Sequence, residues 1–259
     1  IIWGAMPIYW KAIEAVSSFE ILGHRVVWSV VFTSVLIAFN KNWQIFKKML
    51  RSGKRDLFWL AVGGFLISFN WGLYIWAVND GRVLETSLGY FINPLLSMFL
   101  GMIFFKEKLN RIQTLALGLA VLGVSIELAA AGSLPLVSLG LALSFGLYGL
   151  LKKTVRVSPE IALFTETLTV TPFAMAWIKK KKKEGASSFP YDSMTNLMLA
   201  GSGIMTSIPL LMFAYGASRV PLTTVGFVQY ATPTLSFAIG LLIFKEDIHI
   251  NRVFTFMFI

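Results

Sequence analysis

The 259-residue chain is 56% hydrophobic and 14% charged, carries a formal net charge of +10 and has a mean hydropathy of +0.71. Soluble domains carry about 25% charged residues, and a soluble fold of this length has too little interior to bury so much apolar surface. The composition therefore excludes a soluble protein and predicts an all-α polytopic membrane protein surrounded by the lipid bilayer.

The basic excess does not indicate a nucleic-acid partner, because Lys and Arg punctuate apolar segments instead of forming a patch within a soluble domain. The chain has no cysteine and only two histidines. This excludes disulfides and thiolate metal sites and leaves too few ligands for a typical zinc site. We therefore expect neither a metal nor another cofactor, and we do not expect a redox or zinc enzyme.

Apolar runs recur along the whole chain. A bilayer core about 30 Å thick needs about 20 apolar residues for each spanning helix. We expect spans at 1–13, 20–39, 57–78, 86–104, 111–130, 135–151, 159–178, 196–217, 223–244 and 251–259. The first and last are short because the sequence begins and ends within an apolar run, so we expect both helices to be truncated in this chain.

Lys and Arg are more frequent in every second loop than in the loops between, once the lysine run at 179–183 is set aside. The basic loops follow the spans at 20–39, 86–104, 135–151 and 196–217, and the third of them includes Lys152. By the positive-inside rule these loops and both termini face the cytoplasm. The lysine run lies on the opposite side in this arrangement and departs from the rule.

A repeat relates the two halves of the chain. Five residues recur 139 positions later: Pro94, Ser97, Gly101, Lys106 and Glu107 match Pro233, Ser236, Gly240, Lys245 and Glu246. We therefore divide the chain into two five-helix repeats, at 1–130 and 131–259. An odd number of helices gives the two copies opposite orientations, and inverted repeats let one central site open alternately to either side. This favours a transporter over a membrane enzyme or a passive scaffold.

Four stretches resemble the RarD group of the EamA-type drug/metabolite transporter superfamily. They are FEILGHRVVWS (19–29), NWGLYIWAVNDGRVLETSLGYFINPLLSMFLGMIFFKEKL (70–109), SLPLVSLGLALSFGLYGLLKK (133–153) and GFVQYATPTLSFAIGLLIFKE (226–246). Within the second, the run at 89–94 is fairly specific to the group. The resemblance implies ten helices in two inverted EamA repeats and a permease of the bacterial inner membrane. The group is often labelled a chloramphenicol-sensitive or chloramphenicol-resistance permease.

Polar residues inside apolar spans are costly and are candidate functional residues. His24 and Arg25 lie about 7 Å inside the outer end of the second span. In one interpretation Arg25 snorkels to the interface and His24 bonds to Glu20, one turn away. In the other, both bind substrate, and the guanidinium of Arg25 anchors an anionic or carboxylate-bearing solute.

Glu166 lies about 10 Å inside the seventh span, counted from its cytoplasmic end. Burial makes the charged form of a carboxyl costly unless a cation compensates it. Glu166 is therefore the candidate proton-coupling group. The alternative is a protonated glutamate that bonds to a neighbouring helix and has only a structural role.

Aromatic and amide side chains gather in the third, fourth and ninth spans. Rings supply apolar contact and a few polar groups fix the orientation of a ligand, whereas an amide that faced lipid would be left unsatisfied. The further candidate substrate-binding residues are Asn70, Trp71, Tyr74, Tyr90, Asn93, Gln229 and Tyr230. For each aromatic residue, helix packing or interface anchoring is the alternative.

Four prolines lie within or near the first turns of spans: Pro94, Pro172, Pro209 and Pro233. A proline inside a helix removes one backbone hydrogen bond and frees a carbonyl. Pro94, Pro209 and Pro233 are candidate hinges at a broken-helix site, and the first and last of them match across the repeat. An ordinary kink is the alternative, because kinks are common in membrane helices.

These features predict a secondary transporter, a permease or exporter and not an enzyme, for a small amphipathic solute such as an amino acid or a chloramphenicol-like compound. No nucleotide-binding motif occurs in the sequence, so ATP is not the expected driver. Coupling to protons through Glu166 and facilitated diffusion both stay open. The alternatives are a membrane-embedded enzyme with His24 as its base, and a channel or a non-transporting scaffold.

Overall fold

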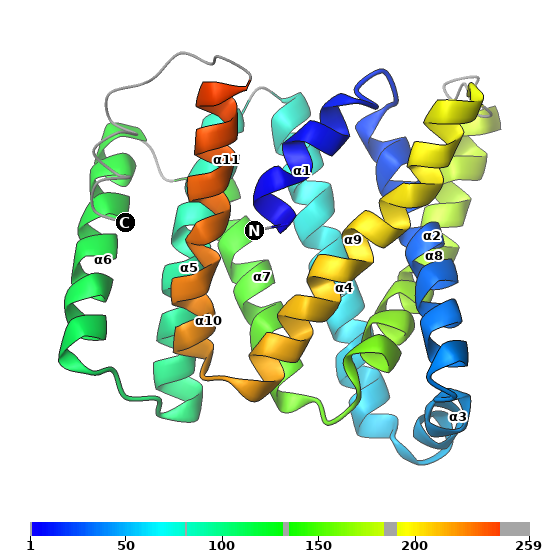
Figure 1. The fold of residues 1–259 in the computed structure, drawn as a ribbon, viewed down its shortest axis with the longest axis horizontal. Coiled ribbons are helices and arrows are strands. Elements are labelled where there is room, and N and C mark those ends of the chain that lie inside the picture. The colour runs from blue at the N-terminus through cyan, green and yellow to red at the C-terminus, as the bar shows by residue number, and fades with distance from the viewer. Residues whose placement is uncertain (1, 81, 132–134, 184–190, 244–259) are drawn as a thin grey trace. The chain divides into compact units, whose positions relative to one another are not determined.

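The computed structural model describes residues 2–80, 82–131, 135–183 and 191–243, and the elements within these ranges are all helices (Figure 1). They are α1 (Ile2–Lys11), α2 (Ser18–Phe39), α3 (Trp43–Ser52), α4 (Lys54–Asn79), α5 (Val83–Phe105), α6 (Arg111–Ala131), α7 (Leu136–Thr154), α8 (Pro159–Lys183), α9 (Ser193–Arg219), α10 (Leu222–Gln229) and α11 (Ala231–Leu242). The all-α class is confirmed.

Six of the described helices are long and apolar enough to cross a membrane: α2, α4, α5, α7, α8 and α9. A shorter apolar stretch lies in α6, at Arg111–Ile126. Each expected span between residues 1 and 217 coincides with one helix to within a few residues. The expected last span, at 251–259, lies outside the described residues. The ten-helix arrangement and the inverted repeats therefore stay predictions.

The chain forms two compact units. Unit 1 contains the described residues of Ile1–Tyr9, Leu73–Leu150 and Arg219–Ile259, and unit 2 contains Trp10–Gly72 and Leu151–Ser218. Each unit therefore takes segments from both of the sequence repeats expected at 1–130 and 131–259. The helices α1, α4 and α7 begin in one unit and end in the other.

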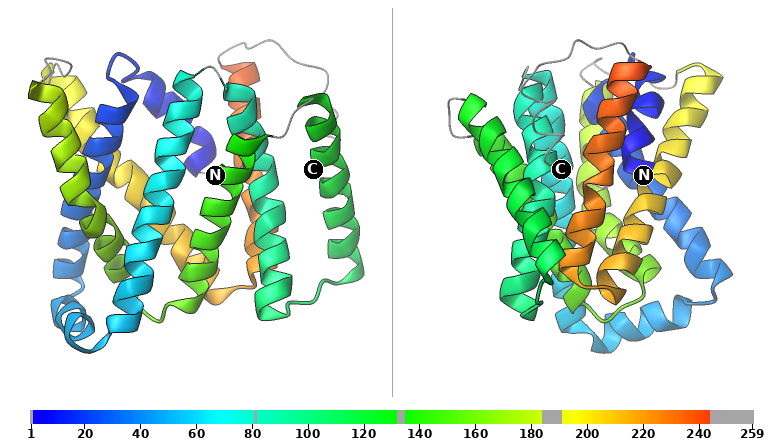
Figure 2. Two further views of the ribbon diagram at one scale, coloured as in Figure 1. Left: turned by 180° about the vertical axis from the view of Figure 1, so that it is seen from behind. Right: turned by 60° about the vertical axis from the view of Figure 1, so that its left-hand side comes forward.

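In unit 1, α10 packs along α5, as both views in Figures 1 and 2 show. Gly226 permits this contact, since a Cβ added there would lie 2.7 Å from the backbone oxygen of Pro94. The carboxylate of Glu107 accepts hydrogen bonds from the backbone N–H groups of Leu222 and Thr223, with N···O distances of 2.8 Å each. The first N–H groups of a helix have no partner within the helix. A negative charge at this end also interacts favourably with the positive end of the helix dipole. Glu107 thus fixes where α10 begins.

The span expected at 223–244 is divided at Tyr230 into α10 and α11. Pro233 has no N–H, so the carbonyl four residues earlier, that of Gln229, loses its helical donor. By contrast, α5 runs through Pro94 and α9 runs through Pro209 without interruption. The hinge role of all three prolines stays a prediction.

In unit 2, α2 and α8 lie side by side along much of their length (Figure 2). Glycines allow other backbones to come close, as is common between membrane helices. A Cβ on Gly64 of α4 would lie 2.5 Å from the backbone oxygen of Glu166 in α8, and a Cβ on Gly203 of α9 would collide with the backbone at Trp28 and Ser29 of α2. These contacts place α4 directly against α8 and α9 directly against α2.

The short helix α3 was not expected, because its ten residues are too few to span a bilayer. Phe46 and Met49 of α3 are buried with Leu60 and Phe164 in the main apolar cluster of unit 2. Lys47 and Lys48 on the same helix are exposed. An amphipathic helix of this kind suits the interface between lipid and water.

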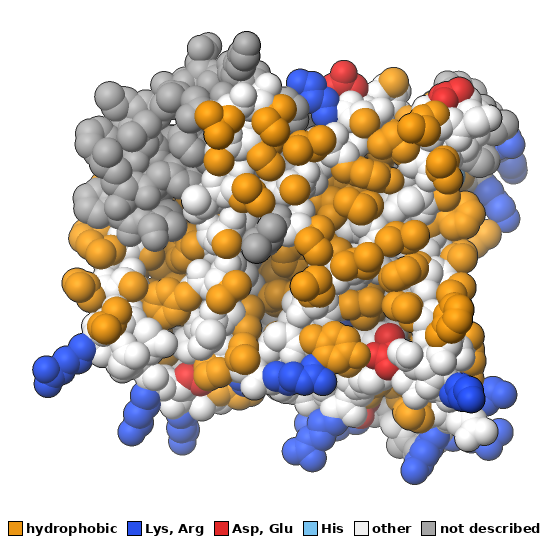
Figure 3. Space-filling view, viewed as in Figure 1, with side chains coloured by type: hydrophobic (Ala, Val, Ile, Leu, Met, Phe, Trp, Pro, Cys, Tyr) orange, Lys and Arg blue, Asp and Glu red, His pale blue; other side chains and the backbone are white. Residues whose placement is uncertain are grey.

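Large apolar side chains remain exposed along the spanning helices, for example Phe39, Phe69, Phe99 and Phe173. In the space-filling view, hydrophobic side chains are spread over much of the visible described surface, and Lys and Arg stand mostly along the lower edge, with others at the top and upper right (Figure 3). An apolar band bordered by basic residues fits a protein solvated by lipid.

The Gly64→Ala variant is expected to lower the free energy of unfolding by about 1–3 kcal/mol, because the new Cβ overpacks the contact between α4 and α8. Gly72→Ala is the matched control in the same helix, since a Cβ there meets nothing within 4 Å. The measurement is unfolding in detergent micelles followed by tryptophan fluorescence. Equal stability of the two variants would contradict the close approach of the two backbones.

Candidate functional site

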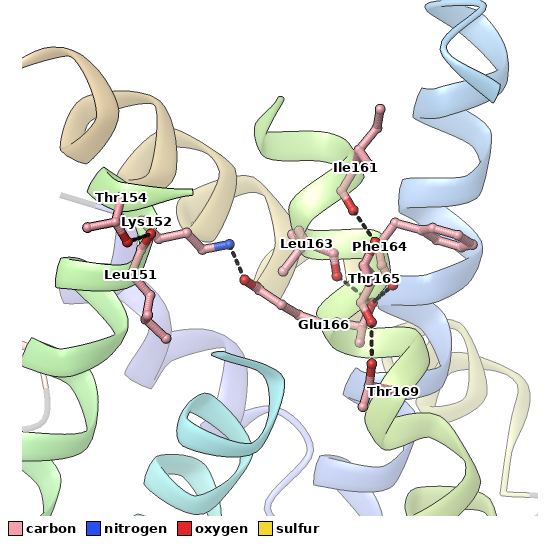
Figure 4. A network of polar contacts seen from close by, with 10 residues as sticks. Leu151, Lys152, Thr154, Ile161, Leu163, Phe164, Thr165, Glu166 and Thr169 are labelled. Atoms are coloured by element: carbon pink, nitrogen blue, oxygen red, sulfur yellow. Dashed lines mark hydrogen bonds and ion pairs between the residues drawn. The ribbon is translucent and has the colours of Figure 1, made fainter. Parts of the chain in front are cut away.

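A buried ion pair joins α7 to α8 in unit 2. The Nζ atom of Lys152 lies 2.6 Å from Oε1 of Glu166, and the two side chains are 4% and 2% exposed. Figure 4 shows them pointing toward each other between the helices. Removing two charges from water is costly, and a short, direct contact is needed to offset that cost. The pair is therefore a specific feature of the interior and not a surface contact.

One feature of a neighbouring helix and one of its own helix position Glu166. Gly63 and Gly64 of α4 lie against it, and a Cβ on Gly63 would lie 3.0 Å from its Oε1. The hydroxyls of Thr165 and Thr167 donate to carbonyls of their own helix, those of Ile161 and Leu163, each at 2.8 Å. These threonines are satisfied locally, so the carboxylate pairs with Lys152 instead.

Lys152 was placed in a cytoplasmic loop by the sequence pattern, and this was wrong. The helix α7 continues to Thr154, and the Lys152 side chain is buried inside the unit. Its position directly after an apolar run gave the misleading signal, because a lysine at the end of a span ordinarily reaches water. A buried carboxylate at Glu166 was the signal that a cation had to be near.

Arg25 lies between two indole rings in unit 2. Its guanidinium carbon is 4.8 Å from the centroid of Trp10 and 4.6 Å from that of Trp71. Its Nε atom donates to Oγ1 of Thr206 at 2.9 Å. Contacts with two aromatic faces and a hydrogen bond fix the plane of the guanidinium. The structure thus brings Arg25 and Trp71 together, and adds Trp10 and Thr206, which the sequence did not nominate.

The other candidates of unit 2 lie near members of this group in the chain. His24 is buried on α2. The carboxylate of Glu20, one turn earlier, accepts the hydroxyl of Tyr191 at 2.9 Å. Asn70 is half-buried next to Trp71, and Pro209 is buried in α9, one turn after Thr206.

The remaining candidates lie in unit 1. Nδ2 of Asn93 donates to Oε1 of Gln229 at 3.2 Å, and the hydroxyl of Ser97 donates to the same oxygen at 3.4 Å. The rings of Tyr74 and Tyr90 contact each other with centroids 5.9 Å apart. The structure therefore joins Asn93 to Gln229 and adds Ser97, which the sequence singled out only as a member of the repeat.

Tyr230 and the two prolines of unit 1 lie near this amide pair in the chain. The hydroxyl of Tyr230 donates to the backbone oxygen of Phe91 at 3.3 Å. Pro94 directly follows Asn93, and Pro233 follows the break between α10 and α11. The predicted residues thus form two groups, one in each unit, and their roles in binding stay predictions.

Replacing only one member of the ion pair, by Lys152→Met or Glu166→Gln, is expected to lower the free energy of unfolding by about 3–5 kcal/mol, because it removes the opposite charge from beside a buried one. The double variant should recover most of that loss, and Lys153→Met is the neighbouring control. The measurement is a double-mutant cycle of unfolding in detergent micelles. Additive losses in the double variant would contradict a direct pair.

Comparison with known proteins gives the family. The profile of the EamA-like transporter family matches residues 1–128 and 133–259. The uncharacterized transporter YojE of Bacillus subtilis (strain 168) is 44% identical, over 99% of this chain and 86% of its own. Protein RarD of Escherichia coli (strain K12) is 42% identical, over 100% of this chain and 87% of its own.

A solved structure, titled only as the crystal structure of a protein, has a similar fold with a TM-score of 0.71. It is 17% identical, and the match covers 99% of this chain and 90% of that one. The family and the names of these relatives point to a transporter and not to an enzyme. The chain, a multi-pass bacterial membrane protein, belongs to the EamA-like transporter family and within it to the RarD group.

Proposed function

We propose that the protein is a secondary transporter that moves a small amphipathic metabolite or drug across the bacterial inner membrane by alternating access. The substrates to test first are amino acids and chloramphenicol-like compounds. Family membership supports the transport activity, and the repeated residues of the two sequence halves support the inverted architecture on which alternating access depends.

The observation that carries the proposal is the buried pair of Lys152 and Glu166. Within apolar helices, two charges seldom improve stability over well-packed apolar residues, and ionisable residues at such positions mark ion or substrate pathways. The pair costs free energy that a purely structural contact would not need. A role in transport gives a reason for keeping it.

The pair also suggests how protons couple to transport. A proton that neutralises Glu166 removes the charge attraction between the two side chains, so it destabilises the paired state. A conformation in which Lys152 meets water or an anionic group then becomes more populated. Proton binding is thereby linked to the conformational equilibrium, since a ligand shifts a population only through its different affinity for the two states.

Each unit supplies its own candidate substrate contacts. In unit 2 the guanidinium of Arg25, fixed by Trp71 and Thr206, suits an anionic or carboxylate group. In unit 1 the side chains of Asn93 and Gln229 suit a neutral polar group. The positive-inside rule supports cytoplasmic termini for this arrangement.

Counterflow in proteoliposomes tests the proposal. Vesicles preloaded with an unlabelled amino acid, or with chloramphenicol, should accumulate the labelled compound transiently, because alternating access exchanges solute across the membrane. The Glu166→Gln variant should keep this exchange and lose uptake driven by a pH gradient. Glu14→Gln, at an exposed carboxylate, is the control and should keep both.

Because Glu166→Gln removes the opposite charge from beside a buried lysine, the double variant with Lys152→Met serves as a second test in which neither charge is present. It should show the same loss of pH-driven uptake. Flat counterflow traces from well-folded wild-type protein, across a broad solute panel, would instead favour a non-transporting scaffold. Full pH-driven uptake in both variants would remove Glu166 from the coupling mechanism.

A further inference from the structure

The amide groups of Asn93 and Gln229 in unit 1 are each only partly used. Oε1 of Gln229 accepts two hydrogen bonds, one from Nδ2 of Asn93 at 3.2 Å and one from the hydroxyl of Ser97 at 3.4 Å. Oδ1 of Asn93 and Nε2 of Gln229 are buried and have no hydrogen-bond partner. One acceptor and one donor are therefore left over on two side chains that already contact each other.

This remainder does not depend on how the two amides are oriented. Each amide carries one carbonyl and one NH₂ group, so reversing both exchanges the roles and again leaves one donor and one acceptor. Buried polar groups are hydrogen-bonded in the large majority of cases, and leaving one unmade is costly. The pair thus leaves one acceptor and one donor available to a further group.

The surrounding packing holds the pair in place. Gly226 allows α10 to lie directly on α5 at Pro94 and Met98, and the hydroxyl of Tyr230 donates to the backbone oxygen of Phe91 in α5. Gln229 is the last residue of α10, so its position is set by these contacts on both sides. Such preorganisation lowers the cost of binding a ligand.

An aromatic surface adjoins the amides. Tyr90 precedes Asn93 by three residues on α5, which places both on one face of the helix. Its ring contacts that of Tyr74, and the two residues are 47% and 36% exposed. Exposed rings beside a few fixed polar atoms are typical of a small-molecule site.

We propose that Asn93 and Gln229 form a carboxamide-recognition site for small aromatic or apolar molecules. The N–H of the ligand would donate to Oδ1 of Asn93, and its C=O would accept from Nε2 of Gln229. Asparagine and glutamine read paired donors and acceptors on nucleobase edges by the same chemistry. This inference rests on the proposed function and names a substrate class for it.

The same geometry predicts what the site rejects. A ketone offers only an acceptor, so it leaves Oδ1 of Asn93 without a hydrogen bond. A site that hydrogen-bonds an N–H group of its ligand discriminates strongly against an analogue that lacks this group. A carboxylate has no donor either, and it brings a charge into an apolar setting beside an acceptor oxygen. Benzamide, acetophenone and benzoate share one phenyl ring and separate these cases.

The test is equilibrium binding of the three labelled compounds to the full chain in lipid nanodiscs. Wild type should bind benzamide at least about tenfold more tightly than acetophenone or benzoate. Gln229→Glu keeps the shape of the side chain and an oxygen for Asn93 and Ser97, but removes the free donor. It should weaken benzamide binding by about tenfold or more. Gln44→Met, at an exposed amide on α3, should leave binding unchanged.

Two results would overturn the inference. One is equal or tighter binding of benzoate or acceptor-only acetophenone. The other is that benzamide binds Gln229→Glu and Asn93→Leu as tightly as wild type, while either variant has a lower thermal stability. That result would mean that the pair holds only a water molecule. Counterflow separates the two proposals. Benzamide selectivity without any exchange would refute transport alone, and exchange without amide preference would refute the carboxamide site alone.

Discussion

The structure depends on one constraint, that polar groups inside apolar helices must find their partners within the protein. The pair of Lys152 and Glu166 is its clearest expression, because both charges are closed off from water and lie 2.6 Å apart. Gly63 and Gly64 make this possible by letting α4 approach α8 at the carboxylate. In unit 2, α4 and α7 thus both contact α8 at the Glu166 carboxylate.

The same constraint explains unit 1, with neutral groups in place of charges. Glu107 satisfies the first N–H groups of α10, and Gly226 brings that helix onto α5. Asn93 and Ser97 of α5 then both donate to the side-chain oxygen of Gln229 in the contact. Here the satisfaction is incomplete, and the two remaining atoms distinguish a candidate binding site from a closed structural network.

Much of the fold could be predicted from hydrophobic length alone, because a helix that crosses lipid must be long, apolar and internally hydrogen-bonded. The helices α2, α4, α5, α7, α8 and α9 follow from that rule. The helix α3 does not follow from that rule, since it is too short to span a bilayer and its apolar face packs into the cluster that contains Phe46. The break at Tyr230 follows from Pro233, yet Pro94 and Pro209 leave their helices continuous, so proline alone does not decide where a helix divides.

By itself, the sequence determined the class of protein, the span positions and which polar side chains lie in apolar surroundings, among them Arg25, Glu166 and Asn93. These properties depend on local composition and helical period. Only the tertiary structure decided the partners: Lys152 for Glu166, Thr206 for Arg25, and Gln229 for both Asn93 and Ser97. The physical reason is that each contact joins side chains of different helices, and no spacing along one helix specifies which neighbour it faces.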